Sequence, residues 1–305
     1  MQSLKSIKNR IGSIKSTKKI TQAMKIVAAS RLKRAQDNVA KTKEYLQTFD
    51  NLLLSIYNTN KSVFQEGNSP YLQNNNQQND QQSDQQNILI VVFGSDRGLC
   101  GSFNSKLISA IAHKISTSND KNIKVICVGD KVSNYMNIHY KENVEFNIPF
   151  ANPYNKSISY PHVASLSQKI QNLFKDKNFS ECRILYTRFK SMMHQKVINT
   201  KLLPLDMDYI ANIEAQSKDK EIFEFDNDLY MTLEQVVLHL ISATIFNVYA
   251  NSVACEYSTR MIAMDSATQN SEKMLKELSL IYNRSRQALI TKELIEIISG
   301  AEAIN

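Results

Sequence analysis

Glycine, proline and tryptophan are scarce in this chain, and their scarcity narrows the possible folds. Among 305 residues there are 7 glycines, 5 prolines and no tryptophan. Loop-rich and all-β proteins need many turn residues, so this composition favours long helices instead. The length suits one or two domains, and the apolar fraction of 42% suffices for a modest core.

Cysteines are also few, and uninterrupted apolar runs are short. The four cysteines form no C-x-x-C pair; they are Cys100, Cys127, Cys182 and Cys255. This spacing predicts reduced thiols in a cytosolic protein rather than a disulfide framework. We expect no signal peptide, and no stretch approaches the ~20 apolar residues of a membrane span, so membrane association is expected only through a partner.

Motifs of catalysis are missing as well. The five histidines lack the spacing of metal ligands, and no nucleophile-elbow, zinc-protease or paired-carboxylate arrangement occurs. The sequence therefore contains no catalytic constellation, and we expect neither a cofactor nor a metal.

Acidic residues are absent from the N-terminal segment. Ten cations and no acid lie between Met1 and Arg34, whereas residues 206–228 hold eight acids against two lysines. This polarity suggests an anionic partner, either the acidic loops of a protein or a nucleic acid. An ordinary solvated helix face, the commonest role of a charge run, stays an alternative. Lys18 and Lys25 occupy the otherwise apolar seam of the helix, which suggests an acidic neighbour at that level or a local splaying of the paired helix.

What the sequence does contain is a seven-residue apolar repeat at each end. One frame runs without a slip from Leu4 to Ile56, and the other from Leu233 to Leu289. Such spacing keeps one face turned toward a partner helix over many turns, as in coiled coils. We therefore predict an antiparallel pair of helices covering about 4–57 and 229–299.

The two predicted helices differ in length, so part of the longer helix should remain unpaired. At ~1.5 Å per residue the first spans roughly 80 Å and the second roughly 105 Å. If they start at one level, the first ends near residue 284 of the second, and residues 287–305 project alone. That segment is apolar around most of its circumference, which predicts a socket in another protein.

The amino-acid composition changes twice along the middle of the chain. Residues 68–87 are polar and of low complexity, which is typical of a disordered linker or surface loop. Apolar runs of strand length then alternate with helical patterns, which predicts a Rossmann-like α/β domain with a largely parallel sheet. The expected strands are 88–93, 123–128, 183–189 and 197–205, and the expected helices between them are 103–115 and 161–174.

The predicted fold class is thus mixed α and α/β, with the α/β domain inserted between the two halves of an antiparallel coiled coil. The predicted parts are a discontinuous coiled-coil shaft (1–57 and 229–305), a disordered linker (58–87), the α/β domain (88–205) and an acidic connector (206–228).

The loop Gly94–Gly101 follows the first predicted strand and precedes a helix, where nucleotide-binding folds hold phosphate. Its glycines fall at spacings of four and three, so it matches neither the dinucleotide fingerprint nor the P-loop. A tight strand-to-helix connection with a surface pair of Asp96 and Arg97 is the simpler interpretation. A nucleotide-binding enzyme centred on this loop stays an alternative.

Three ordered stretches resemble the gamma subunit of F-type ATP synthases. Ile26 replaces a methionine common in that family, Arg31 replaces a lysine, and the Gln/Asn tract at 74–87 lies outside the family pattern. The stretches are Ile20–Arg31 (ITQAMKIVAASR), Asp96–Gly101 (DRGLCG) and the C-terminal pattern from Arg260 to Ala301.

The resemblance implies a central rotor shaft that is not itself an enzyme and that couples rotation of a c-ring to conformational changes at the catalytic sites of beta subunits. It implies as partners a hexamer of alpha and beta subunits, an epsilon subunit and the membrane c-ring, at the cytoplasmic face of the cell inner membrane. The alternative is a nucleic-acid-binding helical protein that uses the basic N-terminal helix. The residues that match partner contacts of the family are Lys18, Met24, Lys25, Arg31, Lys33, Arg286, Gln287 and Thr291.

Overall fold

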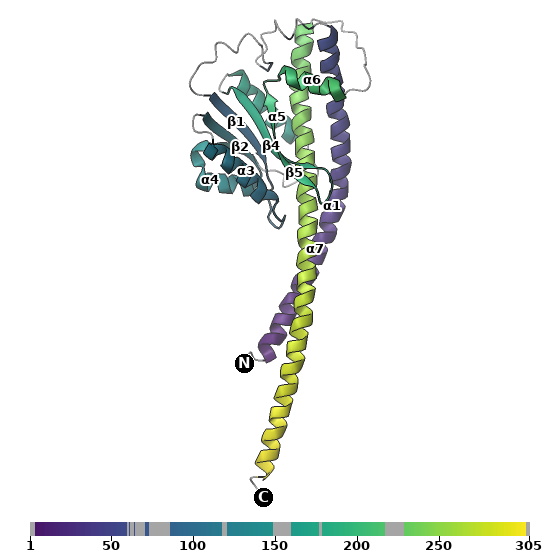
Figure 1. Cartoon of the computed structure of the whole chain (residues 1–305), viewed down its shortest axis with the longest axis vertical. Helices are drawn as coiled ribbons and strands as arrows, with labels where there is room; N and C mark the ends of the chain where they lie inside the picture. Colours follow the sequence, from purple (N-terminus) through teal and green to yellow (C-terminus); the bar gives the residue numbers. More distant parts are fainter. Residues whose placement is uncertain are drawn as a thin grey trace. The chain divides into compact units, whose positions relative to one another are not determined.

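The protein is seen here in a computed structural model, in which its described residues form two compact units. One unit comprises residues 1–30 and 260–305, and the other comprises residues 31–259. Two long helices, α1 (Leu4–Thr59) and α7 (Leu229–Glu302), contribute residues to both units (Figure 1). The described residues are 4–59, 61, 64, 71–72, 86–117, 121–148, 160–176, 179–216 and 229–302.

A five-stranded sheet organises the unit of residues 31–259. Its strand order is β3-β2-β1-β4-β5. The pairs β3–β2, β2–β1 and β1–β4 are parallel, and only β4–β5 is antiparallel, so the predicted largely parallel sheet is confirmed. The strands are β1 (Gln86–Phe93), β2 (Lys121–Val128), β3 (Val144–Ile148), β4 (Glu181–Phe189) and β5 (Gln195–Leu203).

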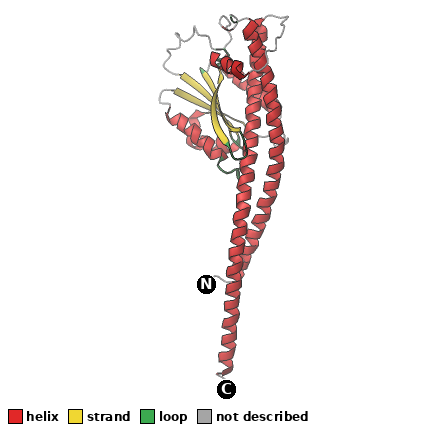
Figure 2. Ribbon diagram, turned by 45° about the vertical axis from the view of Figure 1, so that its right-hand side comes forward, coloured by secondary structure: helices red, strands yellow, loops and turns green. Residues whose placement is uncertain are grey.

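Helices cover both faces of this sheet (Figure 2). Side chains alternate along a strand, so β1 sends Ile88, Ile90 and Val92 to one face and its other apolar residues to the opposite face. The first set packs with α3 and α4, and the second packs with α5, α1 and α7. The helices are α3 (Phe103–Thr117), α4 (Asp130–His139), α5 (Tyr160–Lys175) and α6 (Met207–Gln216), and a short 3₁₀ helix covers Lys141–Asn143.

Three elements, β3, α4 and α6, occur where the sequence patterns predict none. The helix α6 lies within the segment predicted as an acidic connector, of which residues 217–228 lie outside the described residues. Most of the predicted linker 58–87 also lies outside them. Its apolar members Phe64, Tyr71 and Leu72 are buried, so these three residues belong to the core instead. The four-part division of the chain remains a prediction.

Within each unit, α1 and α7 run antiparallel, because advancing along α1 means moving back along α7. In the unit of residues 31–259 three contacts show this order. Arg31 Nη1 donates to Tyr257 Oη at 3.2 Å, Asn247 Nδ2 donates to Thr42 Oγ1 at 3.3 Å, and the Phe49 ring stacks on His239 at 5.7 Å. The predicted antiparallel pairing is confirmed.

The helix α7 has a higher mean hydropathy than its short apolar runs, which polar residues interrupt, would suggest. By length and composition it meets the criteria for a membrane span, with a mean hydropathy of 1.4 over 18 residues. However, 72% of that window is buried inside the protein, and a core helix of this kind satisfies the same criteria.

Candidate partner interface

The unit of residues 1–30 and 260–305 consists of the helix pair. Along α1, every residue of the predicted seven-residue frame from Leu4 to Ala28 is buried or half-buried there. Every other residue from Lys5 to Ser30 is exposed. The seam is therefore confirmed residue by residue, and it leaves most of the surface of α1 to solvent or to partners.

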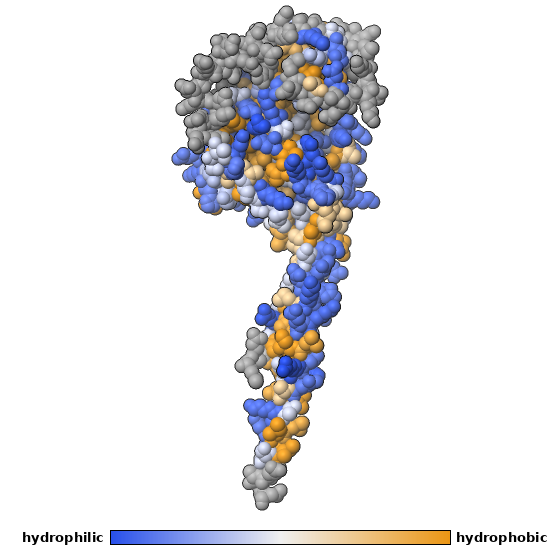
Figure 3. Space-filling model, viewed as in Figure 1, coloured by the Kyte–Doolittle hydropathy of each residue, from blue (hydrophilic) through white to orange (hydrophobic). Residues whose placement is uncertain are grey.

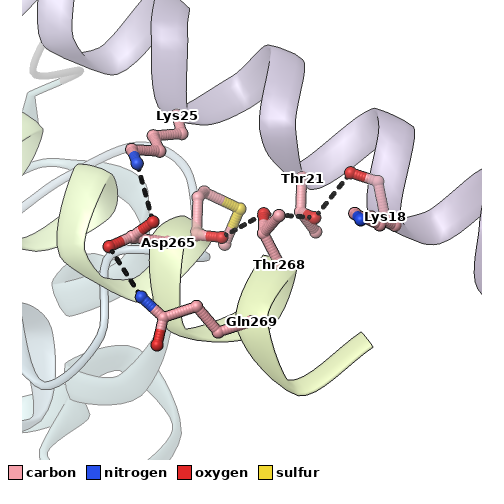
Figure 4. A network of polar contacts seen from close by, with 7 residues as sticks. Lys18, Thr21, Lys25, Asp265, Thr268 and Gln269 are labelled. Atoms are coloured by element: carbon pink, nitrogen blue, oxygen red, sulfur yellow. Dashed lines mark hydrogen bonds and ion pairs between the residues drawn. The ribbon is translucent and has the colours of Figure 1, made fainter. Parts of the chain in front are cut away.

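Polar residues occupy the middle of this seam, as Figure 4 shows for two pairs. Thr268 Oγ1 donates to Thr21 Oγ1 at 2.8 Å, and Lys25 Nζ lies 2.7 Å from Asp265 Oδ1. One turn away, Lys18 Nζ lies 3.4 Å from Glu272 Oε1. The acidic neighbour predicted from the seam lysines is thus α7 of the same chain.

Three of the predicted contact residues therefore already have partners within the chain. Lys18 and Lys25 form the ion pairs just described, with side chains 30% and 42% exposed. Ion pairs so open to water contribute at most about 1 kcal/mol each. In the other unit, Arg31 bonds the Tyr257 hydroxyl and lies 5.6 Å from the centre of its ring.

The predicted contact residue Met24 lies outside the seam in an exposed apolar stripe. Its neighbours at helical spacing are Ile20 and Val27, and the three are 59%, 40% and 51% exposed in chain order. Such a stripe on a helix is normally covered by another surface. Lys33, which belongs to the other unit, is exposed as well.

The end of α7 extends beyond the seam. Tyr282 and Ser285 are its last half-buried residues, and every residue from 286 to 300 is exposed. The predicted unpaired segment is thus confirmed for residues 287–300, while the exposure of 301–305 lies outside what the structure describes. Apolar side chains gather on this part of the surface (Figure 3). Its large apolar residues, each 44–67% exposed, are Leu289, Ile290, Leu294, Ile295, Ile297 and Ile298.

The remaining predicted contact residues lie at the base of this segment. Arg286, Gln287 and Thr291 are all exposed. The Thr291 hydroxyl donates to the Gln287 carbonyl at 3.0 Å, a bond within the helix. The side chains of Arg286 and Gln287 are thus presented to solvent in this unit, where a partner could accept hydrogen bonds from them.

The loop Gly94–Gly101 has its polar groups bonded within the chain. Ser95 is fully buried; its hydroxyl donates to the Arg97 carbonyl at 2.9 Å and accepts from Asn104 Nδ2 at 2.8 Å. The Lys131 amide donates to the Ser95 carbonyl at 3.0 Å. These bonds fix the loop as a connection between β1, α3 and α4, and the surface pair of Asp96 and Arg97 stays a prediction.

The cysteines and the other possible metal ligands among the described residues do not gather into a metal site. All four cysteines are buried and free, and burial raises the pKa of the Cys127 thiol to about 12. Within the described part of the chain, no three or more histidine, cysteine, aspartate or glutamate residues cluster as a metal ion requires.

These features define a class of protein in which the two ends pair as antiparallel helices, an α/β domain lies between them in sequence, and an apolar helix end is left for a partner. A model of the protein family described as ATP synthase matches residues 3–304. The ATP synthase gamma chain of Pelagibacter ubique (strain HTCC1062) is 36% identical over 306 residues, and that of Rhodospirillum rubrum is 35% identical over 310; both alignments cover 100% of each chain. The chain belongs to the ATP synthase gamma chain family.

Solved structures share the fold. A chain in the Euglena gracilis mitochondrial ATP synthase, in a structure of OSCP, F1 and c-ring, matches with a TM-score of 0.67 and 18% identity, covering 99% of this chain and 94% of that one. A chain in the central stalk and c-ring structure from Tetrahymena thermophila matches with a TM-score of 0.59 and 21% identity, covering 81% and 99%. The predicted fold class and family resemblance are confirmed.

Proposed function

We propose that this chain is the central rotor shaft of a proton-translocating ATP synthase. The observation that carries the proposal is the exposed end of α7, residues 286–300, with its six large apolar side chains. An apolar helix end without a neighbour among the described residues of its own chain needs an enclosing partner. We infer that the hexamer of alpha and beta subunits of the complex supplies this partner.

Rotation of such a shaft acts on the surrounding subunits through unequal contacts. The sides of the helix pair differ, since α1 carries exposed lysines and an apolar stripe where the end of α7 is mostly apolar. Each catalytic subunit meets a different side, so its open and closed states differ in contact free energy, and nucleotide affinities change as the shaft turns. By reciprocity, nucleotide binding turns the shaft. Catalysis itself belongs to the beta subunits.

Within this proposal the predicted contact residues fall into two groups. Arg286, Gln287 and Thr291 lie on the exposed end of α7, and Met24 and Lys33 are exposed on α1, so these five meet the beta subunits directly. The cations Lys18, Lys25 and Arg31 share their charge between an internal partner and an acidic beta-subunit loop. Such sharing is feasible because a lysine has three donors and an arginine five.

The remaining parts of the proposal concern place and neighbours. The α/β domain binds an epsilon subunit and the c-ring, and the complex holds the chain peripherally at the cytoplasmic face of the cell inner membrane. Family membership favours protein partners over the nucleic-acid alternative.

Deleting Thr291–Asn305 tests the proposal. Because residues 291–300 are exposed, the shortened chain should fold and assemble, while ATP-driven proton pumping by the complex in membrane vesicles falls severalfold relative to its ATP hydrolysis. Circular dichroism of the isolated chain checks the fold. Lys106→Ala, an exposed change on α3, is the control that should leave pumping intact. Unchanged pumping after the deletion, or purification of the native chain without partner subunits, would count against the proposal.

A further inference from the structure

The short helix α6 is held at its start by a charged cap. Asp206 Oδ1 accepts a hydrogen bond from the Tyr209 amide at 3.0 Å, which is the usual role of an aspartate before a helix. The other carboxylate oxygen, Asp206 Oδ2, pairs with Lys201 Nζ of β5 at 3.0 Å. The beginning of α6 is thus fixed to the last strand of the sheet.

Tyr209 then connects α6 to both long helices in the same unit. Its hydroxyl donates to Asp50 Oδ1 of α1 at 2.8 Å, and its side chain packs against the core to which α7 contributes Leu240 and Ile241. Ile210 beside it is buried, and Ile213 packs against the same core, so α6 covers apolar surface as well. Figure 1 shows α6 lying across α1 and α7.

The Asp50 carboxyl loses part of its contact with water where α6 covers it. It is half-buried against α6, and loss of water raises its pKa from 3.8 to about 6, although the hydrogen bond from Tyr209 offsets part of the rise. If α6 lifts away, the carboxyl loses the cover of Tyr209 and regains water, so its pKa falls toward the ordinary value. Docking of α6 thus favours the protonated carboxyl.

We propose that α6 is a proton-sensitive clasp, which closes over α1 and α7 through Tyr209 and Asp50 and holds more firmly as the surroundings become acidic. The direction follows from linkage. Below about pH 4 the carboxyl is neutral whether α6 is docked or not, and docking is strongest. Between about pH 4 and 6 it is neutral only when docked, so docking weakens as pH rises through this window. Above about pH 6 the carboxyl is charged in both states, and docking is weakest.

Four other titratable or charged groups on α6 and on the elements packed against it are either paired or exposed. Lys201 and Asp206 pair with each other at the start of α6. Glu214 on α6 and His239 on α7 are both exposed, and His239 stacks on Phe49. Among the described residues, Asp50 is the carboxyl that α6 covers through a direct hydrogen bond to its Tyr209.

Hydrogen exchange of the full-length chain tests the clasp, independently of the rotor function proposed above. Amide protection of α6, corrected for intrinsic exchange rates, is measured by mass spectrometry at pH 7.5 and pH 5. We expect protection to rise at least threefold toward pH 5, with about 10-fold as the limit there, because pH 5 lies about one unit below the pKa of about 6 that Asp50 has when α6 is docked.

Two substitutions distinguish titration of Asp50 from other effects of low pH on the chain. Asp50→Asn keeps an oxygen for Tyr209 but cannot titrate, so protection of α6 should become equal at the two pH values. Asp37→Asn, an exposed acid on the same helix, should retain the wild-type response. Equal protection of wild-type α6 at both pH values, or a wild-type response in Asp50→Asn, would overturn the proposal.

Discussion

At the scale of single residues, Gly94 shows how closely the end of β1 approaches α4. A Cβ atom at this position would lie 2.3 Å from Val132 Cγ2. Val132 is fully buried, and its branched side chain has little rotamer freedom, so it cannot move aside. We expect Gly94→Ala to lower the free energy of unfolding by about 1–3 kcal/mol. Urea denaturation followed by circular dichroism measures this.

Gly98 in the same loop provides the matched control. There a Cβ would lie 3.8 Å from Lys131 Cε, an ordinary contact with a flexible side chain. Gly98→Ala should therefore change stability by no more than about 0.5 kcal/mol. Equal stability of the two variants would show that the approach of β1 to α4 is looser than described.

The seam lysines show how far prediction from single residues extends. Their place on an apolar frame predicts an acidic neighbour, and the structure supplies Asp265 and Glu272. These acids flank the apolar frame of α7 without belonging to it, so the apolar pattern carries no sign of them. Only the opposite charges, once the antiparallel order is known, identify the pairs.

At the scale of elements, the length of the repeated apolar pattern determined which helices could be predicted from the sequence. The helices α1 and α7 repeat one frame over many turns, and their predicted ends fall within three residues of those observed. The helix α4 has only ten residues, so Val132 and Met136 make a single apolar step of helical spacing. In α6 the apolar face of Tyr209, Ile210 and Ile213 lies among acidic residues, which made the segment resemble a solvated connector.

Alanines buried in the helix pair set how closely the elements pack. Ala250 of α7 is fully buried, as are Ala243 and Ala254, so these alanines serve packing and not only helix propensity. We expect Ala250→Leu to destabilise the chain by about 1–3 kcal/mol, because a larger side chain has no room. Ala40→Leu, at an exposed site on α1, keeps nearly the same helix propensity and should be close to neutral. If both changes cost the same in urea denaturation, propensity rather than packing explains the alanines.

At the scale of the whole molecule, the same antiparallel pairing of α1 and α7 recurs in both compact units. In one unit it provides the surface against which the sheet and α6 pack. In the other it forms a seam that ends before the last exposed residues of α7. The rotary coupling proposed above is inferred from family membership, because the contacts within one chain do not reveal it.

A disulfide across the seam tests this pairing most directly. The Thr21 and Thr268 hydroxyls lie 2.8 Å apart, so the variant Thr21→Cys with Thr268→Cys brings two sulfurs within bonding reach. The four native cysteines are buried and should not compete. Mild oxidation should give a rapid disulfide bond within one chain, detected by mass spectrometry after digestion.

The control Thr21→Cys with Leu275→Cys, displaced by seven residues, should stay reduced. Faster bonding in the displaced pair, or bonds only between chains, would contradict the antiparallel seam.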